Sequence, residues 1–372
     1  MLQTAIRFIL YDKPKSIGAA VGIFFSVFLV GQQAGVFLFL TNSIRNLVES
    51  NSSYIWVVDA STRDANRTVP LDVRIGRQVA TFQGVRRVHE VVVGAGSVRL
   101  PNGETSALSI IGVQVPNFAG LWNMQPGTHR EDLLPEGAVF LDIFSQNLKN
   151  VRIGDYFEIN GHQVFKAGET RATQGLGVDY GFTTLDRARV ITGFAPDKVS
   201  FFLVEPLPGA DKASIVRTIN AAIPFARAWD GQALSDSTFR IAIKEGGFAS
   251  TFGFLILFAI VAGFVIIGLT LYSAAIDRIR DYGTLKALGA TNSYVRRLIV
   301  VQALIFAIIG YAIGRVMVEG FRSLLASLGS IFSFTLPMEV ALFLITLFIA
   351  VGGSLFAIRR VNSQEPAAVF RQ

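Results

Sequence analysis

Four long apolar stretches dominate the pattern of hydrophobic and polar positions along the chain. They predict membrane-spanning helices at 18–40, 248–272, 298–317 and 338–358. Each stretch is close to the roughly 20 apolar residues that an α-helix needs to cross a hydrocarbon core of about 30 Å. In lipid, a helix satisfies its own backbone polar groups. The pattern therefore predicts an α-helical integral membrane protein with four transmembrane helices.

The first 17 residues precede these spans and mix apolar with basic positions. Read at a helical period, one face carries Leu2, Ile6, Ile9 and Leu10, and beside it lie Arg7, Lys13 and Lys15. This pattern predicts a cytoplasmic amphipathic helix on the membrane surface, and a frayed N-terminus is the alternative. The apolar run that follows is longer than that of a secretion signal and has no cleavage site behind it. We therefore expect a retained anchor.

Residues 41–247 lie between the first two spans and return to the pattern of a globular domain. Two strand–helix–strand units are predicted, one at 54–60, 71–82 and 85–100, and the other at 200–205, 211–223 and 225–229. A kink is expected in the third segment of the first unit, at Gly94 and Gly96. The two units predict a large, split extracytoplasmic α/β domain with parts at about 50–115 and 198–235.

A β-rich insertion is expected between these two parts, at about 116–197. Apolar and polar residues alternate over 105–114, 151–165 and 187–194, and turn signals stand at Pro101-Asn-Gly and Asn160-Gly. The Gly- and Thr-rich stretch from Gly168 to Phe182 shows no periodicity. We interpret that stretch as a surface loop, with a mobile tip as the alternative.

Composition and charge support this membrane topology. The chain is 51% hydrophobic and only 16% charged, its net charge is +7, and its mean hydropathy is +0.47. Basic residues gather before the first span, at 273–297 and at 359–372, whereas the loop at 318–337 holds only Arg322. Because short cytoplasmic segments carry the excess of Lys and Arg, we expect both termini inside. The basic excess thus indicates topology and not nucleic-acid binding.

Residues for catalysis, redox chemistry or metal binding are sparse. The chain has no cysteine, and its three histidines, His89, His129 and His162, are too scattered for metal-ligand spacing. No phosphate-binding loop occurs, and Gly94-Ala-Gly96 lacks the third glycine of a dinucleotide fingerprint. The apolar runs 18–40, 248–272, 298–314 and 340–358 hold no Asp or Glu for a proton or sodium relay. We predict a non-catalytic subunit with no cofactor or metal of its own and an external energy source.

Small residues at four-residue spacing predict close helix packing. The glycine pairs are Gly18 and Gly22, Gly31 and Gly35, and Gly310 and Gly314. Gln32 and Gln33 lie beside the second pair, where their amides could bridge neighbouring helices. Both packing within one chain and a dimer seam are consistent with this pattern. Arg315, at the end of the third span, is expected either to snorkel to the interface or to make a functional contact.

The segment at 273–297 carries the most specific pattern. It contains Asp281-Tyr-Gly-Thr-Leu-Lys-Ala-Leu-Gly-Ala-Thr291. We expect a short amphipathic helix that ends at Gly289 and restarts through Thr291 or Asn292 as the cap of the third span. Such an elbow between two spans is suited to transmitting force.

This segment resembles the signature of MacB/FtsX-like ABC transporter permeases, roughly R-x-R-E-[IY]-G-x-L-[RK]-A-[LI]-G-A-[ST]. The residues that match directly are Gly283, Leu285, Lys286, Ala287, Gly289, Ala290 and Thr291. Asp281 stands where the family has Glu. The tail from Pro366 to Arg371 resembles the closing P-x-x-A-L-R motif, from which Val369 and Phe370 depart. Among these permeases the chain is most similar to the DevC-type branch, which lacks a fused ATPase domain.

The resemblance implies a permease subunit of the bacterial inner membrane with a MacB-like periplasmic domain. It implies a separate ABC ATPase that binds ATP and Mg and receives the elbow, and a second permease copy in a homodimer. A periplasmic membrane fusion protein and an outer-membrane channel are further expected partners, for export of a hydrophobic or amphipathic substrate. The alternatives are an FtsX-like signalling subunit that controls an extracytoplasmic hydrolase, and a lipoprotein-releasing permease.

Overall fold

The computed structural model describes residues 2–11, 13–145, 148–277, 279–327, 329 and 332–362. The chain divides into two compact units. The first, which we call the helical unit, comprises Met1–Leu38, Ala249–Leu325 and Phe332–Gln372. The second, the sheet domain, comprises Phe39–Phe248 and Ala326–Ile331. The closing motif predicted at Pro366 to Arg371 lies outside the described residues.

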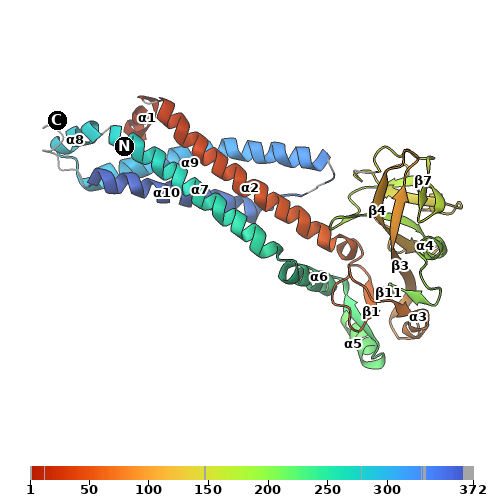
Figure 1. Cartoon of the computed structure of the whole chain (residues 1–372). Coiled ribbons are helices and arrows are strands. Elements are labelled where there is room, and N and C mark those ends of the chain that lie inside the picture. The colour runs from red at the N-terminus through yellow and green to blue at the C-terminus, as the bar shows by residue number, and fades with distance from the viewer. Residues whose placement is uncertain are drawn as a thin grey trace. The chain divides into compact units, whose positions relative to one another are not determined.

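The helical unit is built from long apolar helices (Figure 1). Its elements are α1 (Leu2–Tyr11), α2 (Lys13–Glu49), α7 (Phe248–Asp277), α8 (Ile279–Ala287), α9 (Asn292–Ser327) and α10 (Leu336–Asn362). Within the described residues, α2, α7, α9 and α10 are long and apolar enough to cross a membrane. The prediction of four spans is therefore confirmed, although each helix extends beyond its predicted bounds. The last turns of α2 belong to the sheet domain.

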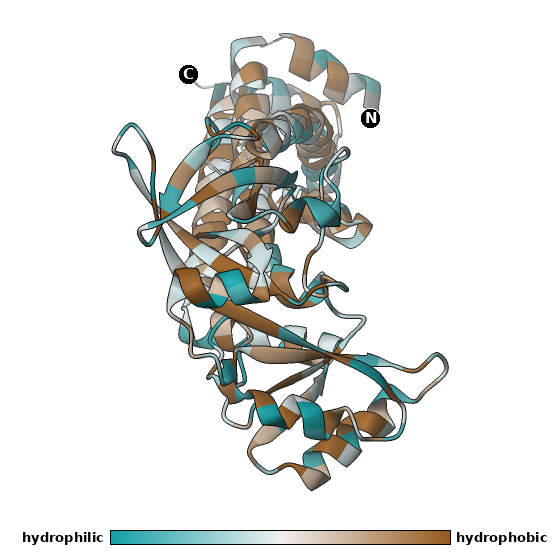
Figure 2. Cartoon of the chain, turned by 90° about the vertical axis from the view of Figure 1, so that its right-hand side faces the viewer, coloured by the Kyte–Doolittle hydropathy of each residue, from teal (hydrophilic) through white to brown (hydrophobic). Residues whose placement is uncertain are grey.

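The sheet domain combines twelve strands with four α-helices in its described part. Its strands are β1 (Ile55–Asp59), β2 (Leu71–Asp72), β3 (Val85–Arg99), β4 (Thr105–Val113), β5 (Ala138–Asp142), β6 (Tyr156–Ile159), β7 (His162–Thr170), β8 (Gln174–Gly175), β9 (Val178–Thr184), β10 (Lys198–Val199), β11 (Phe201–Pro206) and β12 (Ala226–Asp230). Its helices are α3 (Val73–Val79), the 3-10 helix η1 (Arg130–Leu133), α4 (Leu185–Thr192), α5 (Lys212–Ala222) and α6 (Gly231–Glu245). Hydrophobic and hydrophilic residues lie side by side along these elements (Figure 2).

The two predicted strand–helix–strand units interleave in one sheet. The strand order is β12-β1-β11-β3, and each of these neighbours is antiparallel. Each unit therefore has a strand of the other unit between its own two strands, as in a split βαβ arrangement. The prediction of a split α/β domain is confirmed, but the first helix is shorter than expected. It starts at Val73 because Leu71 and Asp72 pair with β10.

Both faces of this sheet are covered, which explains the unbroken apolar runs of its central strands. Ile55 and Val57 of β1 contact the cluster that includes α3 and α5 residues. Trp56 and Val58 point to the opposite cluster, which includes α6 and the end of α2. A strand with two buried faces gains from apolar residues at every position, and not only at alternate ones.

The insertion forms a closed barrel. Six strands follow the order β3-β4-β9-β5-β7-β6, and β6 pairs back onto β3 through Val98–Ile159 and Arg99–Glu158. The prediction placed the insertion at about 116–197. In the structure the barrel begins earlier, because β3 pairs with β11 up to Val91 and with β4 from Val91 onward. One long strand is thus shared by the two parts of the domain.

The kink predicted in β3 is wrong. Pairing with β4 runs without a register shift from Val91 to Arg99, through both glycines. A Cβ on Gly94 would lie 2.6 Å from Thr192 Cβ of α4, and one on Gly96 would lie 2.9 Å from Ile159 Cγ2. The glycines therefore allow neighbouring elements to approach the strand, and they do not bend it.

Two further expectations about the insertion are also wrong. Residues 187–194 were expected as a strand but belong mostly to α4, which buries Leu185, Ala188 and Ile191 at a helical spacing. The stretch from Gly168 to Phe182 was expected as a loop but contains most of β9, which pairs with both β4 and β5. The apolar periodicity of this stretch is weak because it includes Gly181, which leaves space for Leu108. A Cβ added to Gly181 would lie 2.7 Å from Leu108 Cδ2.

Candidate functional site

The predicted elbow joins α7 to α9 through α8. Helix α8 ends in paired backbone hydrogen bonds, from Gly289 N to Lys286 O (3.0 Å) and from Ala290 N to Leu285 O (2.9 Å). This is the Schellman arrangement, whose C′ residue must adopt a left-handed conformation. Gly289 occupies that position with φ +98°. The predicted glycine stop is confirmed.

The chain restarts as a helix two residues later. Tyr294 N donates to Thr291 Oγ1 over 3.2 Å, so the threonine side chain caps the first turn of α9. A hydroxyl at this position satisfies one of the amide donors that a helix start leaves free. The predicted cap at Thr291 is confirmed. The Schellman stop and the threonine cap together leave the backbone of this turn little conformational freedom.

The elbow has a buried side and an exposed side. Tyr282 and Gly283 are buried, and the ring of Tyr282 lies 5.8 Å from that of Phe8 in α1. Leu285, Lys286 and Ala290 are half-buried, whereas Asp281, Ala287, Gly289 and Thr291 are exposed. Leu288, at the end of α8, is 81% exposed. It was not among the predicted site residues. An apolar residue at a turn between two capped helices is a signal that could have identified it.

The glycine pairs lie at contacts between helices of the same chain. A Cβ on Gly22 would lie 2.6 Å from Ile266 of α7, and one on Gly31 would lie 2.5 Å from Val318 of α9. Gly310 and Gly314 meet Ile23 and Val27 of α2 at similar distances, and Gly35 meets Phe332. Gly18 is less crowded, with Thr270 Cγ2 at 3.8 Å. These contacts favour packing within the chain, and the dimer seam stays a prediction.

Gln32 and Gln33 do not make the predicted bridges in the described part of the chain. Both side chains are half-buried, and the structure gives neither a hydrogen bond to a neighbouring helix. The glycines beside them already bring the helices into contact, so the packing does not depend on an amide bridge.

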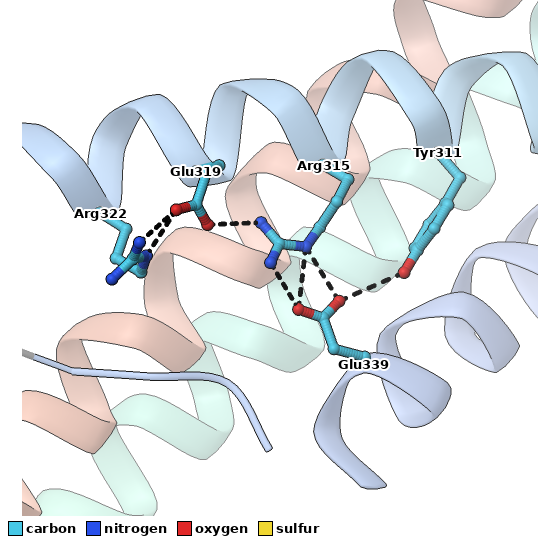
Figure 3. A network of polar contacts seen from close by, with 5 residues as sticks. All are labelled: Tyr311, Arg315, Glu319, Arg322 and Glu339. Carbon is cyan, nitrogen blue, oxygen red and sulfur yellow. Dashed lines mark hydrogen bonds and ion pairs between the residues drawn. The ribbon is translucent and has the colours of Figure 1, made fainter. Parts of the chain in front are cut away.

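A network of charged side chains lies toward the other end of α9 (Figure 3). The guanidinium of Arg315 lies between two carboxylates, with Nε 2.9 Å from Glu339 Oε1 of α10 and NH1 3.1 Å from Glu319 Oε2. Arg322 donates its Nε to Glu319 Oε1 over 2.8 Å, and Tyr311 OH donates to Glu339 Oε2 over 3.3 Å. The network ties α9 to the first turn of α10. Arg315 is therefore paired and does not simply extend into solvent.

Arg315 was predicted without its partners in this network. Arg315, Glu319 and Arg322 follow the i, i+4 and i+3 spacings at which helical side chains of opposite charge meet. That spacing was a usable signal within α9. Glu339 could not be assigned from sequence, because its proximity depends on how α10 packs against α9.

Residues 253–366, which include the elbow, match the family model described as FtsX-like permease C-terminal. The chain carries an FtsX-like permease domain. The match extends from the start of α7 to beyond α10, so it contains the elbow and the charged network. The resemblance deduced from the elbow motif is confirmed for this part of the chain.

Two solved structures resemble about half of the chain weakly. One is the extracellular domain of the noncanonic ABC-type transporter YknZ from Gram-positive bacteria, with 13% identity, 47% of this chain and 98% of that chain covered, and a TM-score of 0.36. The other is the periplasmic region of MacB from Actinobacillus actinomycetemcomitans, with 9% identity, 52% and 95% coverage, and a TM-score of 0.39. No curated protein sequence matches the chain significantly.

The charged network of the permease domain should contribute measurably to stability. In a double-mutant cycle of Arg315→Gln and Glu339→Gln, we expect a coupling energy of about 0.5–3 kcal/mol, because the pair is bidentate and mostly shielded from solvent. Thermal unfolding of the purified protein in detergent would measure it. The exposed pair Arg217 and Asp211 is the control and should couple by only about 0–1 kcal/mol. Equal coupling in both cycles would contradict a clamp between α9 and α10.

Proposed function

We propose that the chain is the permease subunit of an ABC exporter. In this proposal, a separate ATPase subunit binds ATP and Mg, and its movements are transmitted through the elbow to the sheet domain. The exported substrate is hydrophobic or amphipathic, and a membrane fusion protein and an outer-membrane channel complete the export path. The observation that carries the proposal is the elbow itself, which lies inside the family match.

The exposed side of the elbow suits a protein partner. Leu288 is 81% exposed and stands at a turn that both a Schellman stop and a threonine cap hold in place. Burial of a leucine side chain in a partner's groove contributes about 1.5–3 kcal/mol. Because the turn is already ordered, little conformational entropy is lost on binding. A rigid apolar tip of this kind can be pushed or pulled by a partner without bending.

The helices that leave the elbow can carry its displacement over a long distance. Helix α9 has 36 residues, and at 1.5 Å per residue it is about 54 Å long. Its inner end is held by the elbow and its other end by the charged network with α10. Helix α7 begins at Phe248, directly after the last residues of the sheet domain's main segment, where Gly247 has φ +65°, and runs to the elbow. We infer that these helices transmit motion in preference to lining a hydrophilic tunnel, and a path at a dimer interface is the alternative.

The proposal is tested by purifying a tagged copy that is expressed together with its native genetic neighbours. We expect an ABC ATPase to co-purify, and ATP hydrolysis to appear only in preparations that contain it. The control is a Leu288→Asp variant, which should retain membrane insertion and lose the ATPase. ATP hydrolysis by the chain alone would contradict the subunit assignment. Capture of a cell-wall hydrolase in place of a fusion protein would favour the signalling alternative.

The proposed topology places both termini and the elbow in the cytoplasm and the sheet domain outside. Because the chain has no cysteine, single Ser→Cys variants can report the side of each segment. Ser214 in α5 and Ser293 at the start of α9 are both exposed and form a matched pair. In intact cells whose outer membrane has been permeabilised, a membrane-impermeant thiol reagent should label Ser214→Cys and leave Ser293→Cys unlabelled. Labelling of Ser293→Cys before lysis would contradict the model.

A further inference from the structure

A cavity of about 290 Å³ opens on the sheet domain. It lies among the end of α2, α6, the loop at 64–68 and strands β3, β4 and β9. Its walls include the apolar side chains of Leu47, Val93, Val178 and Ile241. At about 30 Å³ for each water molecule, the space corresponds to roughly ten waters. This is the lower end of the size range of small-molecule sites.

A phenol hydroxyl belongs to this cavity and has no protein partner. Tyr180 of β9 lines the cavity and is only 4% exposed. In the described part of the chain, its hydroxyl makes no hydrogen bond. An added Cβ on Gly175 would lie 2.5 Å from this hydroxyl oxygen, so the glycine makes room for the ring. The hydroxyl opens onto the cavity, so a ligand or water that occupies the cavity can satisfy it.

The lining of the cavity carries more negative than positive charge. Its charged lining residues are Asp64, Glu245 and Arg67. Arg67 reaches the carboxylates only at 4.0 Å and 3.9 Å, and its side chain is mostly exposed. Burial raises the pKa of Tyr180, and the negative charge of Asp64 raises it further. Asp64 and Tyr180 therefore line one cavity, and the charge of the carboxylate influences the hydroxyl electrostatically.

We propose that this cavity binds a small amphipathic cation, with its apolar body against the walls and its ammonium group between the hydroxyl oxygen of Tyr180 and the carboxylate of Asp64. Both groups accept hydrogen bonds from an ammonium, and Asp64 adds a charge-assisted bond. The inference rests on the proposed export function and narrows its substrate class. It also places the first binding step in the sheet domain.

The site is tested with the full-length chain in nanodiscs of zwitterionic lipid. The probes are octylammonium, octanol and octanoate, which share one apolar chain and differ in charge. Trp122 reports binding by fluorescence, because its ring centroid lies 5.9 Å from that of Tyr180. We expect octylammonium to bind at least about tenfold more tightly than octanoate, with octanol between them. Equal responses to the three probes, or none, would overturn the proposal.

Variants separate binding in the cavity from partition into lipid. Ala242 of α6 lines the cavity, so Ala242→Phe should fill it and abolish the octylammonium response. Ala222→Phe, on the exposed end of α5, is the matched control and should bind like the wild type. Tyr180→Phe and Asp64→Asn should each weaken octylammonium at least about threefold while leaving octanol nearly unchanged. A response to octylammonium that survives in Ala242→Phe would show partition only and would overturn the site.

The binding experiment needs no ATPase, so it fails independently of the proposed function. If an ATPase co-purifies but octylammonium does not bind, the site is wrong and the permease assignment stands. If the probe binds selectively but no ATPase associates with the chain, the site stands as a receptor and the export proposal falls.

Discussion

Replacing Gly289 by valine should leave the protein in the membrane and uncouple it from the proposed ATPase partner. Gly289 has φ +98°, and within the described part of the chain no atom beyond its immediate neighbours lies within 4 Å of the place where a Cβ would stand. The substitution therefore meets no steric clash with neighbours and acts through the backbone alone. A β-branched residue in this conformation costs on the order of 1–3 kcal/mol. The Schellman stop should be lost and the exposed tip at Leu288 displaced.

Three measurements on Gly289→Val decide this prediction. Membrane abundance should match the wild type, because the four spans fold through contacts outside the elbow. ATPase co-purification should fall, or ATP hydrolysis should continue without export. Gly289→Asn is the control, since asparagine tolerates the left-handed region, and it should retain most of the coupling. Wild-type values of all three measurements for the valine variant would show that the elbow is a passive linker.

Replacing Gly310 by alanine should destabilise the helical unit itself. A Cβ at this position would lie 2.5 Å from Ile23 Cγ2, 2.6 Å from Ile23 Cβ and 3.2 Å from the backbone nitrogen of Phe24. A change of rotamer at Ile23 does not move its Cβ or the backbone, so α2 and α9 must separate. Overpacking of this kind costs about 1–3 kcal/mol. Less protein should accumulate in the membrane, and thermal unfolding in detergent should occur at a lower temperature.

Gly320→Ala provides the matched control on the same helix. Among the described residues, no atom outside the neighbouring turns of α9 lies within 4 Å of a Cβ at Gly320. In an exposed helix interior, alanine is more favourable than glycine by about 1 kcal/mol. This variant should be as stable as the wild type or slightly more stable. If Gly310→Ala and Gly320→Ala unfold at the same temperature, the contact between α2 and α9 is not close in the folded protein.

Much of the helical unit and of the elbow could be predicted from the sequence. A membrane span requires a long apolar run in helix, so the existence of the four spans follows from composition along the chain. The stop at Gly289 and the cap at Thr291 are local as well, because each depends on residues within one turn. Their hydrogen bonds were therefore predictable residue by residue.

The insertion in the sheet domain was predicted less well. Strand β9 is paired on both sides and includes Gly181 at a close contact with Leu108, so its sequence shows no clear alternation. Helix α4 has charged residues between its buried ones and resembles an alternating strand over a short window. Glycines in β3 suggested a kink, although they accommodate Thr192 and Ile159 from distant parts of the chain. In each case, a long-range contact set the role of the residue.

The sequence by itself determined the number of spans, the split α/β character of the large domain and the stop and restart of the elbow. These features depend on residues that are neighbours in the chain, or on apolar periods that one segment carries alone. Only the tertiary structure decided that the insertion closes into a barrel, that Glu339 pairs with Arg315, and that Tyr180 and Asp64 share one cavity. Each of these joins segments whose meeting is set by packing of the whole fold, which no local pattern encodes.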